Sequence, residues 1–140
     1  MDGPCAIGRI RPGGPWIGFQ SSPSGYRLLV GSESSVRSRE ADADLLLALA
    51  IAYFEEAFED PPSELEATHA DMSELVRHAA ALEADDDRRR LLTEAVDAID
   101  DGLAGDAVAN RLTAARTPTS DEQADPVDLL VTLAEELLRD

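Results

Sequence analysis

The sequence predicts an α+β protein that is mainly helical, with an N-terminal three-stranded antiparallel β-meander packed on a four- to five-helix array. Two observations support this fold class. Short β-type runs alternate with Pro- and Gly-rich turns over residues 5–31, whereas apolar residues recur with a helical period over residues 39–140. A chain of 140 residues with an apolar fraction of 44% can bury a core without disulfide bonds. We therefore expect residues 1–140 to form a single domain.

The N-terminal region contains three runs that favour strands, at residues 5–11, 16–20 and 26–31. Turn clusters at residues 12–15 and 21–25 separate these runs at hairpin spacing. Because a three-stranded meander alone is only marginally stable, it is expected to lie against a helix. Residues 32–38 are rich in Ser and are predicted to be a linker.

The first predicted helix covers residues 39–60 and is apolar on nearly every side. At 100° per residue, the stripe that contains Ile51 lies almost opposite the stripe that contains Leu49. A helix of this kind has to be covered on most of its sides. It is therefore either the central helix of the fold or a helix whose Leu49 stripe contacts another subunit. We expect the second arrangement, a homodimer, while the first stays open.

Pro61 and Pro62 are predicted to end this helix, and a second helix is predicted to begin at once. Ser63 as the N-cap and Glu66 three residues later match a capping box. So short a connection predicts that the two helices form an antiparallel hairpin.

Three further helices complete the predicted array. One covers residues 86–103 and has Gly105 as its C-cap residue, and a short helix follows Asp106. The last helix starts at residues 125–126, where an Asp N-cap precedes a Pro at the first helical position. The polar residues 116–124 before it are predicted to be a loop.

The charge is strongly negative and unevenly distributed. The chain has 29 acidic residues and 12 basic ones, and all 12 are Arg. Residues 1–39 carry a net charge of +3, from five Arg against two acids, whereas residues 40–140 carry −20, from seven Arg against 27 acids. Such repulsion opposes compaction, and salt relieves it. The composition favours a halophilic host, although a GC-rich genome would explain the missing Lys equally well.

The single Cys5 excludes an intramolecular disulfide and is expected to act as a small apolar residue in the first strand. The N-terminus lacks the basic and apolar layout of a signal peptide. The longest apolar run, at residues 45–54, is too short to span a bilayer. A cytoplasmic protein without a membrane segment is therefore expected.

Three residues are candidates for a metal site. Glu66 and His69 have the Glu-x-x-His spacing by which helices of di-iron proteins present two ligands on one side. Counting back through the turn places Glu55 or Glu56 opposite His69, and carboxylates with one imidazole suit iron or manganese. However, a di-iron site needs two such motifs, and a structural role explains Glu66 as a capping residue. We therefore expect no resident cofactor.

A second acidic pattern points to a magnesium–nucleotide site. Glu55, Glu56 and Glu59 precede Glu83 and Asp86, so acids stand on successive predicted helices. At these five positions the chain resembles the all-helical MazG-type pyrophosphohydrolases, a resemblance that implies magnesium-dependent cleavage of nucleoside triphosphates. A chain with 29 acidic residues also forms such a pattern by chance.

A nucleic-acid interface is another alternative. The predicted helices around residues 86–115 have helix-turn-helix proportions, and the N-terminal hairpins would serve as a wing. Phosphate contacts would require Arg88–Arg90, Arg111 and Arg116 to converge, because the chain as a whole is acidic. Nucleic-acid binding is therefore expected to be absent unless these side chains form one basic face.

No nucleophile elbow, phosphate-binding Gly loop or Cys–His pairing occurs in the sequence. Arg9, Arg11 and Arg27 of the β region are expected to pair with the acidic helices. The sequence thus favours a non-enzymatic interaction or regulatory module that binds a protein partner or a second copy of itself. A winged-helix-like DNA-binding protein is the first alternative, and a metal-carboxylate helical protein is the second.

Overall fold

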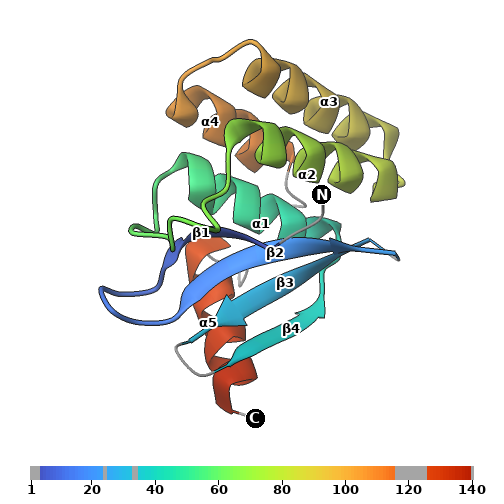
Figure 1. The fold of residues 1–140 in the computed structure, drawn as a ribbon. Helices are drawn as coiled ribbons and strands as arrows, with labels where there is room; N and C mark the ends of the chain where they lie inside the picture. The colour runs from blue at the N-terminus through green and yellow to red at the C-terminus, as the bar shows by residue number, and fades with distance from the viewer. Residues whose placement is uncertain (1–3, 24, 33–34, 116–125, 140) are drawn as a thin grey trace.

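The N-terminal third of the protein forms a four-stranded antiparallel sheet. The computed structural model describes residues 4–23, 25–32, 35–115 and 126–139. The strands follow one another as a meander, in the order β1-β2-β3-β4 (Figure 1). Their bounds are β1 Cys5–Arg9, β2 Trp16–Ser22, β3 Gly25–Gly31 and β4 Val36–Glu40.

The fourth strand corrects the prediction of a linker at residues 32–38 and of a helix from Arg39. All five residues of β4 are exposed, so this strand lacks the apolar–polar alternation by which a half-buried strand is recognised. Its pairing with β3, from Val36 opposite Gly31 to Glu40 opposite Arg27, holds it in place. Backbone hydrogen bonds to β3, rather than burial of side chains, therefore hold β4 in the sheet.

Within the described residues, five helices follow the sheet and make the protein mainly α-helical, so the predicted α+β class is confirmed. They are α1 Ala43–Phe54, α2 His69–Leu82, α3 Asp86–Asp100, α4 Gly105–Ala115 and α5 Pro126–Arg139. None of the helices within the described ranges is long and apolar enough to cross a membrane.

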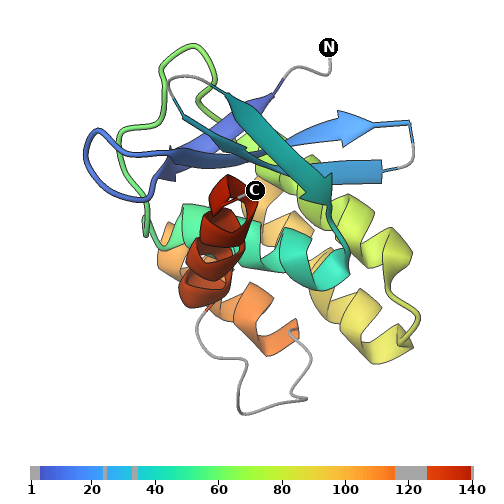
Figure 2. The same ribbon diagram turned by 90° about the horizontal axis from the view of Figure 1, so that it is seen from below.

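Helix α1 is the centre of the fold. Figures 1 and 2 show it between the sheet on one side and α2, α3 and α4 on the other, and α5 packs against α1 and also contacts β3 and β4. Leu49 and Ile51, which represent its two opposite stripes, are both completely buried. The predicted burial on two sides is thus confirmed, and one chain covers both stripes. A dimer is not needed to explain the apolar character of α1.

The segment between α1 and α2, residues 55–68, covers the free edge of β1. The amide of Ala6 donates to the carbonyl of Leu65 at 2.6 Å, and the amide of Arg9 donates to that of Glu59 at 2.8 Å. Gly8 has φ +153°, and a Cβ there would overlap the backbone of Phe58. The predicted tight hairpin between the two helices is therefore wrong, because this long segment pairs with the sheet instead.

Helix α2 begins later than predicted. Thr68 is its N-cap, and Thr68 and Asp71 form a reciprocal capping box. The box predicted at Ser63 and Glu66 is wrong, because the backbone of Glu66 lies beside Ala6 of β1 in a short bridge. Two capping signatures stand close together in the sequence, and strand pairing decides between them.

The later helices agree better with the prediction. Helix α3 ends at Asp100 rather than Leu103, and Gly102, with φ +76°, ends it in place of the predicted Gly105, which opens α4. Helix α5 begins at Pro126 as predicted. Its predicted N-cap Asp125 and the predicted loop at residues 116–124 lie outside the described residues.

Candidate functional site

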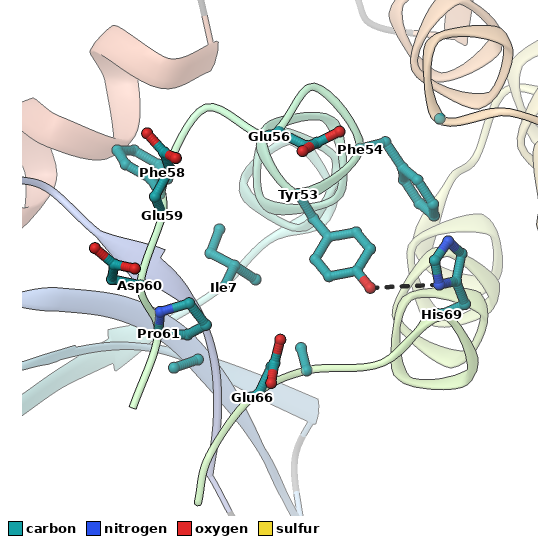
Figure 3. Close-up of a pocket in the computed structure, with 13 residues that line it drawn as sticks. Ile7, Tyr53, Phe54, Glu56, Phe58, Glu59, Asp60, Pro61, Glu66 and His69 are labelled. Atoms are coloured by element: carbon teal, nitrogen blue, oxygen red, sulfur yellow. Dashed lines mark hydrogen bonds between the residues drawn. The ribbon is translucent and has the colours of Figure 1, made fainter. Parts of the chain in front are cut away.

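A pocket of about 450 Å³ lies where the C-terminal end of α1, strand β1, the 55–68 segment and the start of α2 meet (Figure 3). The three candidates Glu56, Glu66 and His69 all line it. Glu56 and Glu66 belong to the 55–68 segment and His69 begins α2, and the pairing of residues 55–68 with β1 brings them together. We call this hollow the acidic pocket.

Four carboxylates give the pocket its negative charge. They belong to Glu56, Glu59, Asp60 and Glu66, and His69 is the only residue with a basic side chain among the described residues of the lining. The pocket also adjoins the C-terminal end of α1, whose last turn contains no basic residue. Because a helix C-terminus carries a partial negative charge, the backbone and the side chains here both favour a cation.

Three rings form one wall of the pocket. The rings of Tyr53 and Phe54 lie edge-to-face with centroids 4.9 Å apart, and the ring of His69 lies 5.6 Å from Tyr53 and 5.4 Å from Phe54. The hydroxyl of Tyr53 lies 3.4 Å from Nδ1 of His69, and it donates this long hydrogen bond when the nitrogen carries no proton (Figure 3). The wall therefore offers an aromatic surface beside the carboxylates.

The Tyr53 hydroxyl keeps its proton at neutral pH. Its pKa is raised, first by burial and then by the negative charges of Glu66 and Asp71. A protonated phenol donates a hydrogen bond and leaves the ring as an uncharged surface. The negative charge of the pocket thus comes from its carboxylates.

Two of the acidic residues adopt left-handed backbone conformations. Glu56 has φ +55° and Asp60 has φ +53°. Glu56 occupies the position after the C-cap of α1 at which Gly is usual, and the left-handed conformation costs a non-Gly residue roughly 1–2 kcal/mol. Such strain gathers at functional sites, so these two residues strengthen the pocket as a candidate site.

The metal arrangements predicted from spacing are not formed. Glu66 precedes α2, so it does not share a helix face with His69. Within the part of the chain that the structure describes, no three His, Cys, Asp or Glu side chains are grouped to hold a metal ion. The carboxylates instead stand at separate points of the pocket wall (Figure 3).

The five acids of the nucleotide-type pattern are also separated. Glu56 and Glu59 line the acidic pocket, whereas Glu83 lies at the opposite end of α2, about 20 Å away at 1.5 Å per residue. Glu83 pairs with Arg88 at 3.6 Å, and Asp86 pairs with Arg89 at 3.0 Å. Both acids therefore form ion pairs around the start of α3.

The arginines proposed for DNA contacts are largely neutralised. Arg88, Arg89 and Arg90 pair with Glu83, Asp86 and Asp87 at 3.6, 3.0 and 3.7 Å. Arg111 lies near the carbonyl of Ala107 on its own helix, and Arg116 lies outside the described residues. At the start of α3, the positive charge that phosphate contacts would need is therefore balanced by neighbouring acids.

The arginines of the β region do not pair with the acidic helices as predicted. Arg9 donates to the carbonyl of Gly14 at 2.9 Å, and Arg27 donates to the hydroxyl of Ser38 at 3.1 Å. Among the described residues, every ion pair lies in α2, α3 or the turn between them. Arg9 and Arg27 therefore make their hydrogen bonds within the sheet region rather than with the helices.

Comparison of the chain with protein-family models, with curated proteins and with solved structures found no match.

Proposed function

We propose that this protein is a non-enzymatic interaction module whose acidic pocket binds an arginine or lysine side chain of a protein partner. The observation that supports this function best is the combination of four carboxylates, an aromatic wall and a helix C-terminus around one hollow. Each of these features attracts a cation.

The shape of the pocket favours an organic cation over a metal ion. A metal needs several ligands at one point, whereas these carboxylates are distributed around a space of about 450 Å³. A guanidinium or ammonium group on an aliphatic stem can contact Glu56 or Glu66 with its head and Tyr53 with its flat or apolar side. The volume is within the range of small-molecule sites, so an entire side chain fits.

The protonation of nearby groups supports recognition rather than covalent chemistry. Burial, assisted by Asp71, raises the pKa of the Cys5 thiol to about 11, and burial also raises the pKa of Tyr53. Neither group is therefore an activated nucleophile at neutral pH. The ring of His69 forms part of the aromatic wall.

The experiment compares two ligands whose termini are blocked and uncharged, N-acetyl-arginine methylamide and the corresponding citrulline compound. The citrulline side chain has nearly the same shape as the arginine side chain but carries no charge. We expect the arginine compound to shift the amide resonances of residues that line the pocket, with the citrulline compound binding at least tenfold more weakly. Glu56→Gln and Glu66→Gln should each weaken arginine binding several-fold. Glu94→Gln, on the exposed face of α3, is the control with the same change in net charge.

Two kinds of result would contradict binding of arginine in the acidic pocket. If the arginine compound shifts resonances over the whole acidic surface, or if Glu94→Gln weakens binding as much as Glu56→Gln does, the attraction is general and the pocket is not the site. Equal binding of arginine and citrulline would also contradict the proposal, because the carboxylates would then contribute nothing.

A further inference from the structure

Strand β4 forms an open edge of the sheet, far from the covered edge at β1 (Figures 1 and 2). The 55–68 segment bonds to β1, but every residue of β4 is exposed. An exposed edge offers unpaired backbone groups to another chain, so its side chains decide which chain can pair there.

The ladder between β3 and β4 determines which backbone groups are available. At one end the amide of Ala41 donates to the carbonyl of Tyr26 at 3.0 Å, and at the other the amide of Ser32 donates to that of Ser35 at 2.8 Å. Hydrogen-bonded pairs alternate with non-bonded pairs in an antiparallel ladder. In this register the odd-numbered residues of β4 bond to β3.

The even-numbered residues therefore direct their backbone groups away from the sheet. These residues are Val36, Ser38 and Glu40. Their amides and carbonyls recur at every second residue, which is the spacing that an added strand requires.

The side chains along this edge are positively charged on one face. Arg37 lies opposite Val30 and Arg39 lies opposite Leu28, so both arginines stand on the face of the sheet that carries the main core. Both are exposed, and neither forms an ion pair with a described residue. Two cations two residues apart match carboxylates at alternate positions of a neighbouring strand.

The same arginines disfavour pairing with a second copy of this edge. A symmetric antiparallel pair centred on Ser38 would place Arg37 against Arg39, and one centred on Arg39 would place that residue against itself. Like charges directly opposite each other destabilise a sheet. A nucleic acid is disfavoured as well, because the chain carries a net charge of −17 and would repel a long polyanion.

We infer that β4 binds an extended acidic segment of a protein partner as a fifth strand, with acidic residues at alternate positions facing Arg37 and Arg39. Main-chain hydrogen bonds at the even-numbered residues would supply affinity, and the two arginines would supply selectivity. This surface is separate from the acidic pocket and has the opposite charge, so it does not depend on the function proposed for that pocket.

The test uses a twelve-residue peptide of alternating Thr and Glu, and a control peptide of the same composition in which Glu occurs in adjacent pairs with no two Glu separated by one residue. We expect the alternating peptide to bind more tightly, and to slow amide hydrogen exchange at Val36, Ser38 and Glu40. The amides of Arg37 and Arg39 already bond to β3, so their exchange should change little.

Variants of β4 separate the contribution of the arginine charges from that of the main-chain hydrogen bonds. The double variant Arg37→Glu, Arg39→Glu should weaken binding of the alternating peptide about tenfold or more, because two attractive pairs become repulsive. Ser38→Pro removes one outward amide without changing the charge, and proline is tolerated at such an edge position. Ser38→Ala is its control, since it removes the same hydroxyl but keeps the amide. Ser38→Pro should abolish binding and Ser38→Ala should preserve it, with amide spectra confirming that both variants remain folded.

Three results would overturn the inference. They are equal binding of the two peptides, binding of the alternating peptide without protection of the even-numbered amides, and tighter binding of a single-stranded oligonucleotide that the charge-reversed variant loses. The last result would identify the edge arginines as phosphate contacts rather than as part of a strand-pairing site.

Discussion

The amide of Ala57 donates to the carbonyl oxygen of Ala52 at 3.0 Å, and this bond closes the C-terminal end of α1 around Glu56. The amide of Glu56 completes the arrangement by donating to Tyr53 at 3.2 Å. Together the two bonds form a Schellman motif with a glutamate at the position where glycine is usual. The carboxylate of that glutamate lines the acidic pocket.

We predict that replacing Glu56 by glycine changes the stability of the fold and the binding of arginine in opposite directions. Glu56→Gly should raise the free energy of unfolding by about 1 kcal/mol, because glycine adopts the left-handed conformation without a steric penalty. The same substitution should weaken binding of N-acetyl-arginine methylamide. Urea denaturation measures the first effect, and Glu56→Ala is the control because it removes the carboxylate but keeps a Cβ. Equal stability of the Gly and Ala variants would show that the backbone is not strained.

A second prediction concerns alkaline pH. Burial is the main cause that raises the pKa of the Cys5 thiol from its ordinary value of 9.0 to about 11, with Asp71 adding to it. The folded state therefore holds its proton more tightly than the unfolded state does. The stability that this provides is complete below pH 9 and is lost as the pH rises through about 11.

The measurement is the urea midpoint of the protein at several pH values from 8 to about 11. Cys5→Ala should lose less stability over this range than the wild-type protein does. A residual decline in the variant is expected from Tyr53, whose pKa is raised in the same sense. If the two proteins lose stability in parallel, the surroundings of Cys5 do not raise the pKa of its thiol.

The prediction of the fold succeeded where burial leaves a periodic pattern. The stripes of α1 that contain Leu49 and Ile51 repeat at helical spacing because both faces are in the core. Strand β4 leaves no such pattern, since all of its side chains are exposed and its position depends on hydrogen bonds to β3. Hydrogen bonds between strands leave no mark on the periodicity of side chains, so this strand could not be predicted from the sequence pattern.

The candidate site was predicted in part, and for the wrong reason. Glu56, Glu66 and His69 were grouped by assuming a helix through residues 63–69, but the pairing of this segment with β1 brings them to one pocket. Tyr53 lies within the apolar run at residues 45–54, and nothing in that pattern indicates that its hydroxyl reaches the ring of His69. The left-handed backbone of Glu56 had no signal in the sequence, because that position usually carries glycine.

Salt dependence is a third prediction. Residues 40–140 carry a net charge of −20, and the ion pairs among the described residues are short-range contacts between exposed or partly exposed side chains that contribute little each. Raising KCl from a low to a molar concentration should therefore raise the melting temperature well beyond the change in a near-neutral protein of similar size. A flat response would contradict the role assigned to charge repulsion and would remove the argument for a halophilic host.

The last prediction tests whether α1 is the internal helix of one chain. Leu49 is completely buried and belongs to the main apolar core, so Leu49→Asp places a carboxylate among buried apolar side chains. Burying such a group costs several kcal/mol, a large part of the roughly 5–15 kcal/mol that stabilises a domain. We expect an unfolded or insoluble chain at every protein concentration, measured by far-ultraviolet circular dichroism and size-exclusion chromatography. Leu103→Asp is the matched control, because Leu103 is 41% exposed and should tolerate the charge. A Leu49→Asp protein that is folded and monomeric, while the wild-type protein is dimeric, would instead show that this stripe is a subunit interface, because only then can the introduced carboxylate reach water without unfolding the chain.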